Sequence, residues 1–405
     1  MLVFLTGYVL LLLSEPITMG IVSGYGPSAL GNASYTIPFA AAACAASGAW
    51  ESGRLRRGNV FGQAPARSRL AIALPLLVPV WAMGVVGMLI AVGVGVSAAG
   101  TLPPFSHLGM FVVYASLMAA ATLAGYLLGG RLPHLAAAPL AMVAGFCLTA
   151  FPGSWDTPWP RHLVAGAYDS CCSVGSVIAP VAVWAPLLFT CGIITASLLA
   201  IAKANFWKPL ATLITASAAS VFLVVDMGYD PVTDRNPDAL VCDAASVPEV
   251  CLWPETPERS RVVATTRSYS GRLKDAGLPV VSSLTQNRDL RPGQASFGGK
   301  GQVREQGIAA NLTNTLLPPI PECARTSHTY PAFPARGPLT AWLTAVATQA
   351  PPTPVQGHVS LEDAKLAQKV LTLPSDRQHA WYETNRAALT GCDQKPSLNP
   401  EGAGR

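Results

Sequence analysis

The chain has 405 residues, 51% hydrophobic residues and a formal net charge of +5, and its charges are spread very unevenly. Fourteen Asp, Glu, Lys or Arg residues precede Gly228, and none lies from Leu70 through Gly130. That charge-free run is far longer than the roughly 20 apolar residues that cross a bilayer once, which argues against a wholly water-soluble protein. Basic residues border the apolar runs and do not gather on one face, so nucleic acid is not an expected partner.

Apolar runs separated by charges or by Pro and Gly predict seven transmembrane helices. A soluble protein could hold such runs as buried core helices, but seven in series without polar faces favour a membrane bundle. The first run has no basic residues ahead of it and no small-residue cleavage site, so we interpret it as a span and not as a signal peptide. The predicted spans are residues 2–22, 34–50, 71–96, 108–128, 135–150, 178–202 and 210–225.

The Lys and Arg residues predict the orientation of this bundle, because cytoplasmic loops are rich in them. With the amino terminus in the cytoplasm, eight of the nine basic residues before Gly228 fall in inner loops, and only Arg161 falls in an outer one. An odd number of spans then places the chain after Met227 outside the cytoplasm. We expect a multi-pass protein of the cell membrane. The eight inner-loop residues are Arg54, Arg56, Arg57, Arg67, Arg69, Arg131, Lys203 and Lys208.

The abrupt return of charge at Gly228 predicts a domain boundary. Residues 1–227 are expected to form a membrane all-α helical bundle of about seven transmembrane helices. Residues 228–395 are expected to form a small extracytoplasmic α/β or α+β domain, followed by a polar, disordered tail over residues 396–405.

Local patterns in the soluble half predict its elements. Helices are expected over residues 338–348, 360–373 and 376–390, and Ser375 with Gln378 matches a capping box. Strands are expected over residues 261–266 and 278–284, which are rich in β-branched side chains. The triplet that begins at Asn311 matches the glycosylation pattern, which is short enough to arise by chance.

Four cysteines of the soluble half predict its covalent framework. An even number in an extracytoplasmic domain indicates two disulfides. Three pairings are possible. We favour Cys242 with Cys251, which closes a short loop and leaves Cys323 to bind Cys392. A zinc site is the alternative, but eight residues between the first two cysteines are a poor spacing for ligands.

The loop after the second span has the most specific pattern in the chain. It reads Gly-Ala-Trp-Glu-Ser-Gly-Arg-Leu-Arg-Arg-Gly over residues 48–58 and Ala-Pro-Ala-Arg-Ser-Arg over residues 64–69. This loop resembles the first cytoplasmic loop of type-two ABC exporter permeases, where a Glu precedes a Gly-containing stretch and a Pro–Arg segment. The matching positions are Glu51, Gly58, Pro65 and Arg69, and Arg54, Arg56 and Arg57 lie between them.

The resemblance implies that this loop forms a short interfacial coupling helix that binds a separate ATPase subunit. An Arg-rich amphipathic segment at the membrane surface can accept force from a partner and pass it to the adjoining spans. The alternative is an ordinary basic inner loop. The long outer loop over residues 151–177 also matches the family, whereas a seventh span departs from it. The same inner loop and the Cys-Leu-Trp-Pro-Glu segment at residues 251–255 also resemble a group of actinobacterial membrane proteins labelled permeases.

The spans hold no buried acidic residue for proton or sodium coupling, so a secondary transporter is not expected. The soluble half lacks serine-hydrolase, zinc-protease and phosphate-loop motifs, so we expect no enzyme, cofactor or metal. The leading hypothesis is a permease-like subunit of an ABC-type exporter, embedded in the lipid bilayer, that moves an unidentified substrate. A separate ATPase subunit would supply the energy, and the permease would work as a homodimer or with a second permease. The competing hypothesis is a membrane-anchored extracytoplasmic binding or assembly protein without transport activity. A membrane-bound enzyme is third.

Overall fold

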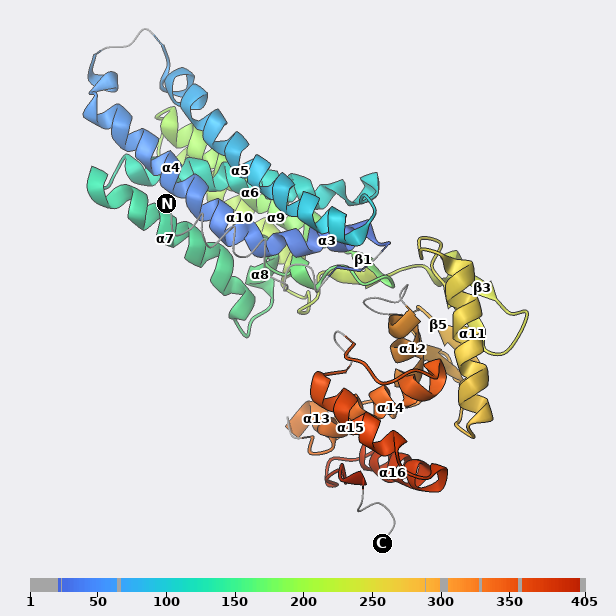
Figure 1. Cartoon of the computed structure of the whole chain (residues 1–405). Coiled ribbons are helices and arrows are strands. Elements are labelled where there is room, and N and C mark those ends of the chain that lie inside the picture. The colour runs from blue at the N-terminus through green and yellow to red at the C-terminus, as the bar shows by residue number, and fades with distance from the viewer. Residues whose placement is uncertain are drawn as a thin grey trace. The chain divides into compact units, whose positions relative to one another are not determined.

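The computed structural model describes residues 21–400, apart from residues 23, 64–66, 288, 299–304, 328–329 and 356–358. The chain divides into two compact units, Met1–Asp234 and Arg235–Arg405 (Figure 1). The first unit is a helical bundle, and the second is a small domain of helices and short strands. The break lies later than the expected boundary after residue 227, because strand β2 (Val232–Asp234) pairs with strand β1 (Ser176–Ile178) of the bundle unit.

Five helices in the described part of the first unit are long and apolar enough to cross a membrane. They coincide with five of the seven expected spans. The expected first span falls almost wholly outside the described residues. The expected second span forms a helix, α4, whose many alanines and charged last turns leave it outside these five. The helices are α3 (Gly26–Ala33), α4 (Ile37–Arg57), α5 (Arg69–Ala99), α6 (Leu108–Gly129), α7 (His134–Ala150), α9 (Pro180–Ile201) and α10 (Trp207–Val224).

Helix α4 packs closely against α6 and α7. Gly125 of α6 lies against the backbone of Ala45, and Gly129 lies against the backbone of Ala49. A Cβ atom at either glycine would overlap that backbone. Glycines four residues apart are typical of helix crossings in membranes, where small residues let two backbones approach. Close packing therefore explains how a helix of modest hydrophobicity occupies the interior of the bundle.

The segment between α7 and α9 forms short elements at one end of the bundle. They are η4 (Phe151–Ser154), α8 (Trp159–Leu163), η5 (Tyr168–Ser170) and strand β1. Three buried tyrosines fasten this end by donating their hydroxyl protons to backbone carbonyls. The bonds run from Tyr25 to Ser176 (2.9 Å), from Tyr114 to Leu30 (2.7 Å) and from Tyr168 to Ala182 (2.7 Å).

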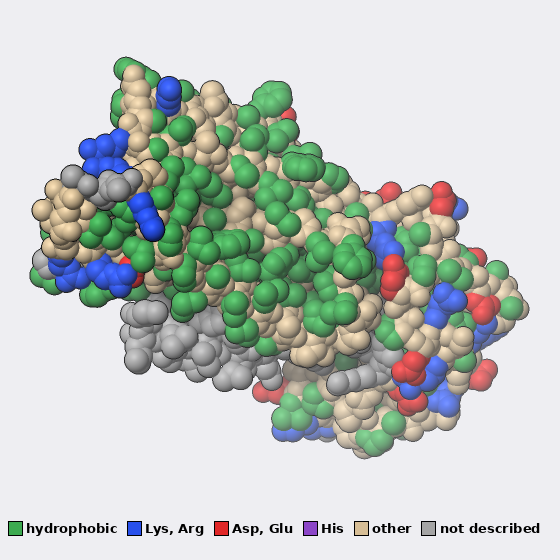
Figure 2. Space-filling model, turned by 90° about the horizontal axis from the view of Figure 1, so that it is seen from above, with side chains coloured by type: hydrophobic (Ala, Val, Ile, Leu, Met, Phe, Trp, Pro, Cys, Tyr) green, Lys and Arg blue, Asp and Glu red, His purple; other side chains and the backbone are tan. Residues whose placement is uncertain are grey.

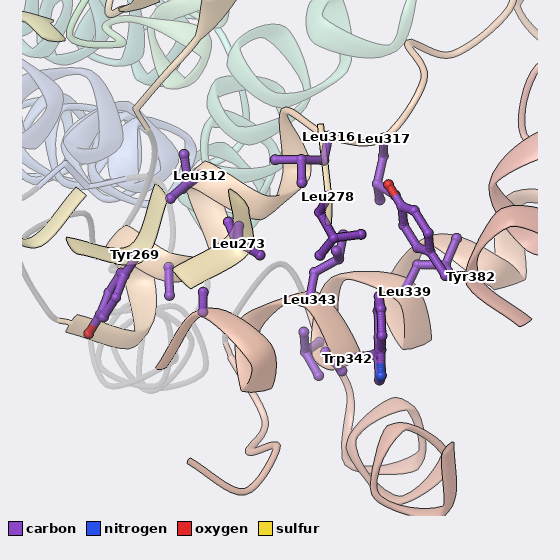
Figure 3. Close-up of a cluster of buried hydrophobic side chains, with 14 of the residues drawn as sticks. Tyr269, Leu273, Leu278, Leu312, Leu316, Leu317, Leu339, Trp342, Leu343 and Tyr382 are labelled. Carbon is purple, nitrogen blue, oxygen red and sulfur yellow. The ribbon is translucent and has the colours of Figure 1, made fainter. Parts of the chain in front are cut away.

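The second unit packs helices against a four-stranded sheet of order β3-β4-β5-β6, in which only the β3–β4 pair is antiparallel. Side chains from several helices fill one core, where Trp342 and Tyr382 stack with ring centroids 5.3 Å apart (Figure 3). The strands are β3 (Val241–Asp243), β4 (Glu249–Leu252), β5 (Ser283–Thr285) and β6 (Gln294–Ser296). The helices are α11 (Arg259–Asp275), α12 (Glu305–Asn314), α13 (Glu322–Ser327), α14 (Arg336–Thr348), α15 (Leu361–Leu371) and α16 (Ser375–Ala388).

Of the two strands expected in this unit, one is wrong and the other is displaced. Residues 261–266 belong to helix α11 and not to a strand, because Val262, Thr266 and Leu273 share a buried helical face. The strand expected over residues 278–284 is shorter and later, as β5. The three expected helices are present as α14, α15 and α16, and each begins and ends within two residues of its predicted bounds.

The expected capping box at Ser375 and Gln378 is also wrong. Gln378 instead accepts a hydrogen bond from the indole Nε1–H of Trp342 (3.0 Å) and donates one to the carbonyl of Leu373 (2.8 Å). A capping box does occur at the start of α15, between Ser360 and Asp363. The buried indole N–H needs an acceptor, and satisfying it takes precedence over the local cap.

The chain beyond α16 departs from the expected disordered tail. Asn385 donates a hydrogen bond to the carbonyl of Ser397 (2.9 Å), and Leu398 packs against the core of the second unit. The unit therefore holds the chain at least as far as Leu398, and residues 401–405 lie outside the described residues.

Candidate functional site

One end of the bundle gathers most of its basic side chains (Figure 2). Apolar contacts join the helix termini there, through Leu55 of α4, Phe61 of the next loop and Ile201 of α9. Glu51 is the one acidic residue in the described segments that form this end. We call it the basic end, and it consists of Arg54, Arg56, Arg57, Arg67, Arg69, Arg131, Lys203 and Lys208.

The last turns of α4 hold Glu51 and three of these arginines. The Glu51 carboxylate forms an ion pair with Arg54 across one helical turn, at 2.9 Å. Arg56 donates a hydrogen bond to the carbonyl of Gly130, at 3.3 Å, which links the end of α4 to the end of α6. The Arg54 side chain is exposed and the Glu51 side chain is partly buried. Ion pairs between neighbouring turns of a helix stabilise it by less than about 1 kcal/mol where solvent reaches them, so the main effect of this pair is to orient the two side chains.

Two arginines of the basic end lie over aromatic rings. The guanidinium of Arg57 lies 5.3 Å from the centre of the Trp50 ring, and that of Arg69 lies 4.7 Å from the centre of the Phe61 ring. Stacking of this kind is favourable, and it leaves the N–H groups at the edge of the guanidinium available for an anion or a carboxylate. The described part of the corner between α4 and α5 is thus a cationic surface in which two arginines stack on aromatic rings.

The shape of this corner differs from the expected coupling helix. Helix α4 continues past the expected end of the span to Arg57, and α5 begins at Arg69 with Ser68 as its cap. Between them the described residues form a turn at Asn59, whose φ is 46°, and a single 3₁₀ turn, η2 (Val60–Gly62). Within these described residues the arginines are presented by the end of α4 and not by a separate interfacial helix. Pro65 lies outside the described residues.

The four cysteines of the second unit pair as expected. Cys242 and Cys251 face each other across strands β3 and β4, and their bond closes a short loop. Cys323 and Cys392 join α13 to the chain after α16, with their Cα atoms 6.3 Å apart. Glu249 lies close enough to Cys242 and Cys251 to complete a group of metal-ligating atoms. However, the two thiols are bonded to each other, which argues against the zinc alternative.

The first unit holds the other five cysteines, and only the pairing of Cys171 with Cys172 was not expected from the sequence. Cys171 and Cys172 form a disulfide between adjacent residues, beside the buried tyrosines of the bundle. The free cysteines among the described residues are Cys44, Cys147 and Cys191, which lie in α4, α7 and α9.

The Cys-Leu-Trp-Pro-Glu segment anchors the start of the second unit. The indole of Trp253 is fully buried, and its Nε1–H donates to the carbonyl of Gln286 at 3.3 Å. The guanidinium of Arg235 lies 4.1 Å from the centre of that ring and forms an ion pair with Glu255 at 2.8 Å. These contacts give the segment a structural role.

An open hollow of about 390 Å³ lies beside strand β3. It is lined by Cys242, Asp243 and Arg259, among others. A hydrogen bond from Arg267 (2.8 Å), followed by one from the backbone N–H of Ala245, lowers the pKa of Asp243 below its ordinary value. One carboxylate and one guanidinium are too few convergent polar groups to define a ligand.

Residues 250–392 match the family model described as "Domain of unknown function (DUF7224)". The matched range begins in strand β4 and ends at Cys392, so it lies within the second unit and leaves out the α4–α5 corner. No curated protein and no solved structure matches the chain.

Proposed function

We propose that the chain is a permease-like membrane subunit of an ABC-type exporter, driven by a separate ATPase subunit and without chemistry of its own. The α4–α5 corner is the observation that carries this proposal. It presents Arg54, Arg56 and Arg57 to solvent at the end of a helix that packs against α6 and α7. A partner that moves this end would move a helix whose close contacts leave it little independent freedom.

The proposed orientation has the basic end in the cytoplasm and the second unit outside it. Basic residues concentrate on the cytoplasmic side of membrane proteins. Disulfides persist in oxidising compartments, and the second unit contains two of them. The position of the basic residues and the disulfides of the second unit therefore support the same orientation.

Co-purification tests the proposal. The full chain should be extracted under gentle conditions and examined for a nucleotide-binding subunit that copurifies. Replacing Arg54, Arg56 and Arg57 with Ala should abolish this association, because it removes three exposed charges from the α4–α5 corner. The matched control removes three exposed charges from the second unit, with Lys274→Ala, Arg291→Ala and Lys365→Ala, and should leave the association intact. An ATPase that remains bound to the first variant contradicts the proposal, as does the absence of any ATPase.

The second unit favours the competing function, that of a membrane-anchored extracytoplasmic binding or assembly protein. It has its own hydrophobic core and two disulfides, and the family match lies wholly within it. In that case the helices serve as an anchor. Cells that carry the triple Arg→Ala variant of the α4–α5 corner should then behave like cells that carry the wild type, and unlike cells that lack the protein. Loss of the phenotype in that variant, with the second unit still folded, contradicts this alternative.

A further inference from the structure

The turn between α9 and α10 exposes two large aromatic side chains next to each other. Phe206 is 67% exposed and Trp207 is 69% exposed, and their rings meet edge to face with centroids 5.6 Å apart. Lys203 and Lys208 flank this pair in the sequence, and both are exposed. Aromatic rings beside lysines are typical of the level at which lipid headgroups meet the hydrocarbon core.

The backbone of this turn is closed by hydrogen bonds, and its residues lie directly between the ends of α9 and α10. The N–H of Ala202 donates to the carbonyl of Leu198 (2.9 Å), and the N–H of Lys208 donates to that of Asn205 (2.9 Å). Lys203 adopts a left-handed conformation, with φ of 56°, which reverses the chain after α9. The backbone of the turn therefore presents the aromatic pair and the two lysines on one short segment between the helices.

The length of α10 places the turn at the membrane surface if this helix spans. Its 18 residues correspond to about 27 Å of helix, close to the roughly 30 Å of the hydrocarbon core. Trp207 is its first residue, and only 11% of its apolar window is buried inside the protein. Most of this helix is therefore available to lipid, and the aromatic pair stands at its end.

The charges of the turn favour an anionic lipid over a neutral one. No Asp or Glu occurs between Asp169 and Asp226. Among the described residues, no acidic side chain forms an ion pair with Lys203 or Lys208. We propose that the α9–α10 turn binds the headgroup of an anionic phospholipid, with the two ammonium groups on the phosphate and the two rings among the adjoining glycerol and acyl groups. The interaction does not depend on the proposed export function.

Native mass spectrometry of the full chain in detergent tests this site. The protein is titrated with phosphatidylglycerol and with phosphatidylcholine of the same acyl chains, and phosphatidylglycerol should be retained preferentially. Replacing Lys203 and Lys208 with Ala should weaken phosphatidylglycerol binding roughly 30-fold, as expected from about 1 kcal/mol for each lysine near an anionic surface. The variant Phe206→Ala/Trp207→Ala should weaken the binding of both lipids.

Two controls make the result specific. Lys365→Ala with Lys369→Ala removes the same charge from exposed positions of α15 and should leave lipid binding unchanged, whereas Lys203→Arg with Lys208→Arg should retain it. Equal retention of the two lipids by the wild type, or unchanged phosphatidylglycerol binding after the Lys→Ala changes, overturns the proposal. Displacement of the lipid by inorganic phosphate at a similar concentration also overturns it, because the turn would then be a site for a free anion. If the variant Lys203→Ala with Lys208→Ala loses a copurifying ATPase while its lipid binding stays unchanged, the turn is a contact site for that ATPase and the lipid proposal fails.

Discussion

His162 lies on the short helix α8, and its Nε2–H donates to the carbonyl of Gly228 at 2.8 Å. Its Nδ1 atom is buried without a hydrogen-bond partner. Burial lowers the pKa of His162 below its ordinary value of 6.5, although the bond to Gly228 opposes this shift. Arg161 lowers the pKa further, and Asp230 raises it. The imidazole is therefore neutral in the folded protein at pH 7, where it fastens α8 to the chain after α10.

This histidine should make the stability of the bundle depend on pH. As the pH falls below about 6.5, the unfolded chain binds a proton that the folded chain excludes, so the free energy of unfolding decreases. It stops decreasing below the lowered pKa of the folded state. The melting temperature of the detergent-solubilised protein should therefore fall between about pH 7.5 and about pH 5.5, and His162→Gln should reduce that dependence. An identical pH dependence in wild type and variant would show that other groups cause it.

Single residues were predictable from sequence where the number of partners is small. Four cysteines allow only three pairings, and loop length was enough to favour the observed one. Gln378 shows the opposite case, because its cap pattern is local while its actual partner, Trp342, is distant in the sequence. Asn311 is a second residue whose local pattern is misleading. Its triplet matches a glycosylation pattern, yet the side chain is buried in α12, where a glycan has no room in the folded unit.

At the scale of elements, hydrophobicity predicts the long spans well and the packing of α4 poorly. Charge-free apolar runs fix α5, α6, α9 and α10 to within a few residues. The role of α4 depends on contacts with α6 that no local pattern contains. Helix α11 was missed for a related reason: its β-branched residues favour a strand locally, but they pack as one face of a helix against the core.

The crossing of α4 and α6 supplies a prediction at this scale. Gly125→Leu should destabilise the bundle, because any side chain there meets the backbone of Ala45. Overpacking costs about 1–3 kcal/mol where side chains can yield, and more where the obstacle is backbone. The matched control is Gly93→Leu on α5, where a Cβ meets nothing within 4 Å. We expect a lower melting temperature in detergent for the first variant only. Equal melting temperatures would show that the two helices separate easily at this point.

At the scale of the whole molecule, the distribution of charge identified two units, but it placed their boundary too early. The residues after Met227 are polar enough to read as part of the soluble domain, yet β2 pairs with β1 and so returns to the bundle. Strand pairing over a long sequence distance has no local signal. The exporter hypothesis rests on the α4–α5 corner of the first unit, whereas the family match falls in the second unit. A cytoplasmic ATPase can reach the corner only if the corner lies on the cytoplasmic side of the membrane, so the orientation of the chain has to be measured.

Thiol labelling in intact cells measures that arrangement directly. A membrane-impermeant maleimide should label Lys365→Cys, an exposed position on α15, without permeabilisation. It should label Arg131→Cys, at the basic end, only after the membrane has been permeabilised. The wild type supplies the background, since its free cysteines among the described residues lie in helices of the bundle. Eight basic residues at one end and two disulfides in the second unit both favour this outcome. Labelling of Arg131→Cys in intact cells, or protection of Lys365→Cys there, would reverse the orientation and remove the α4–α5 corner from the reach of any cytoplasmic ATPase.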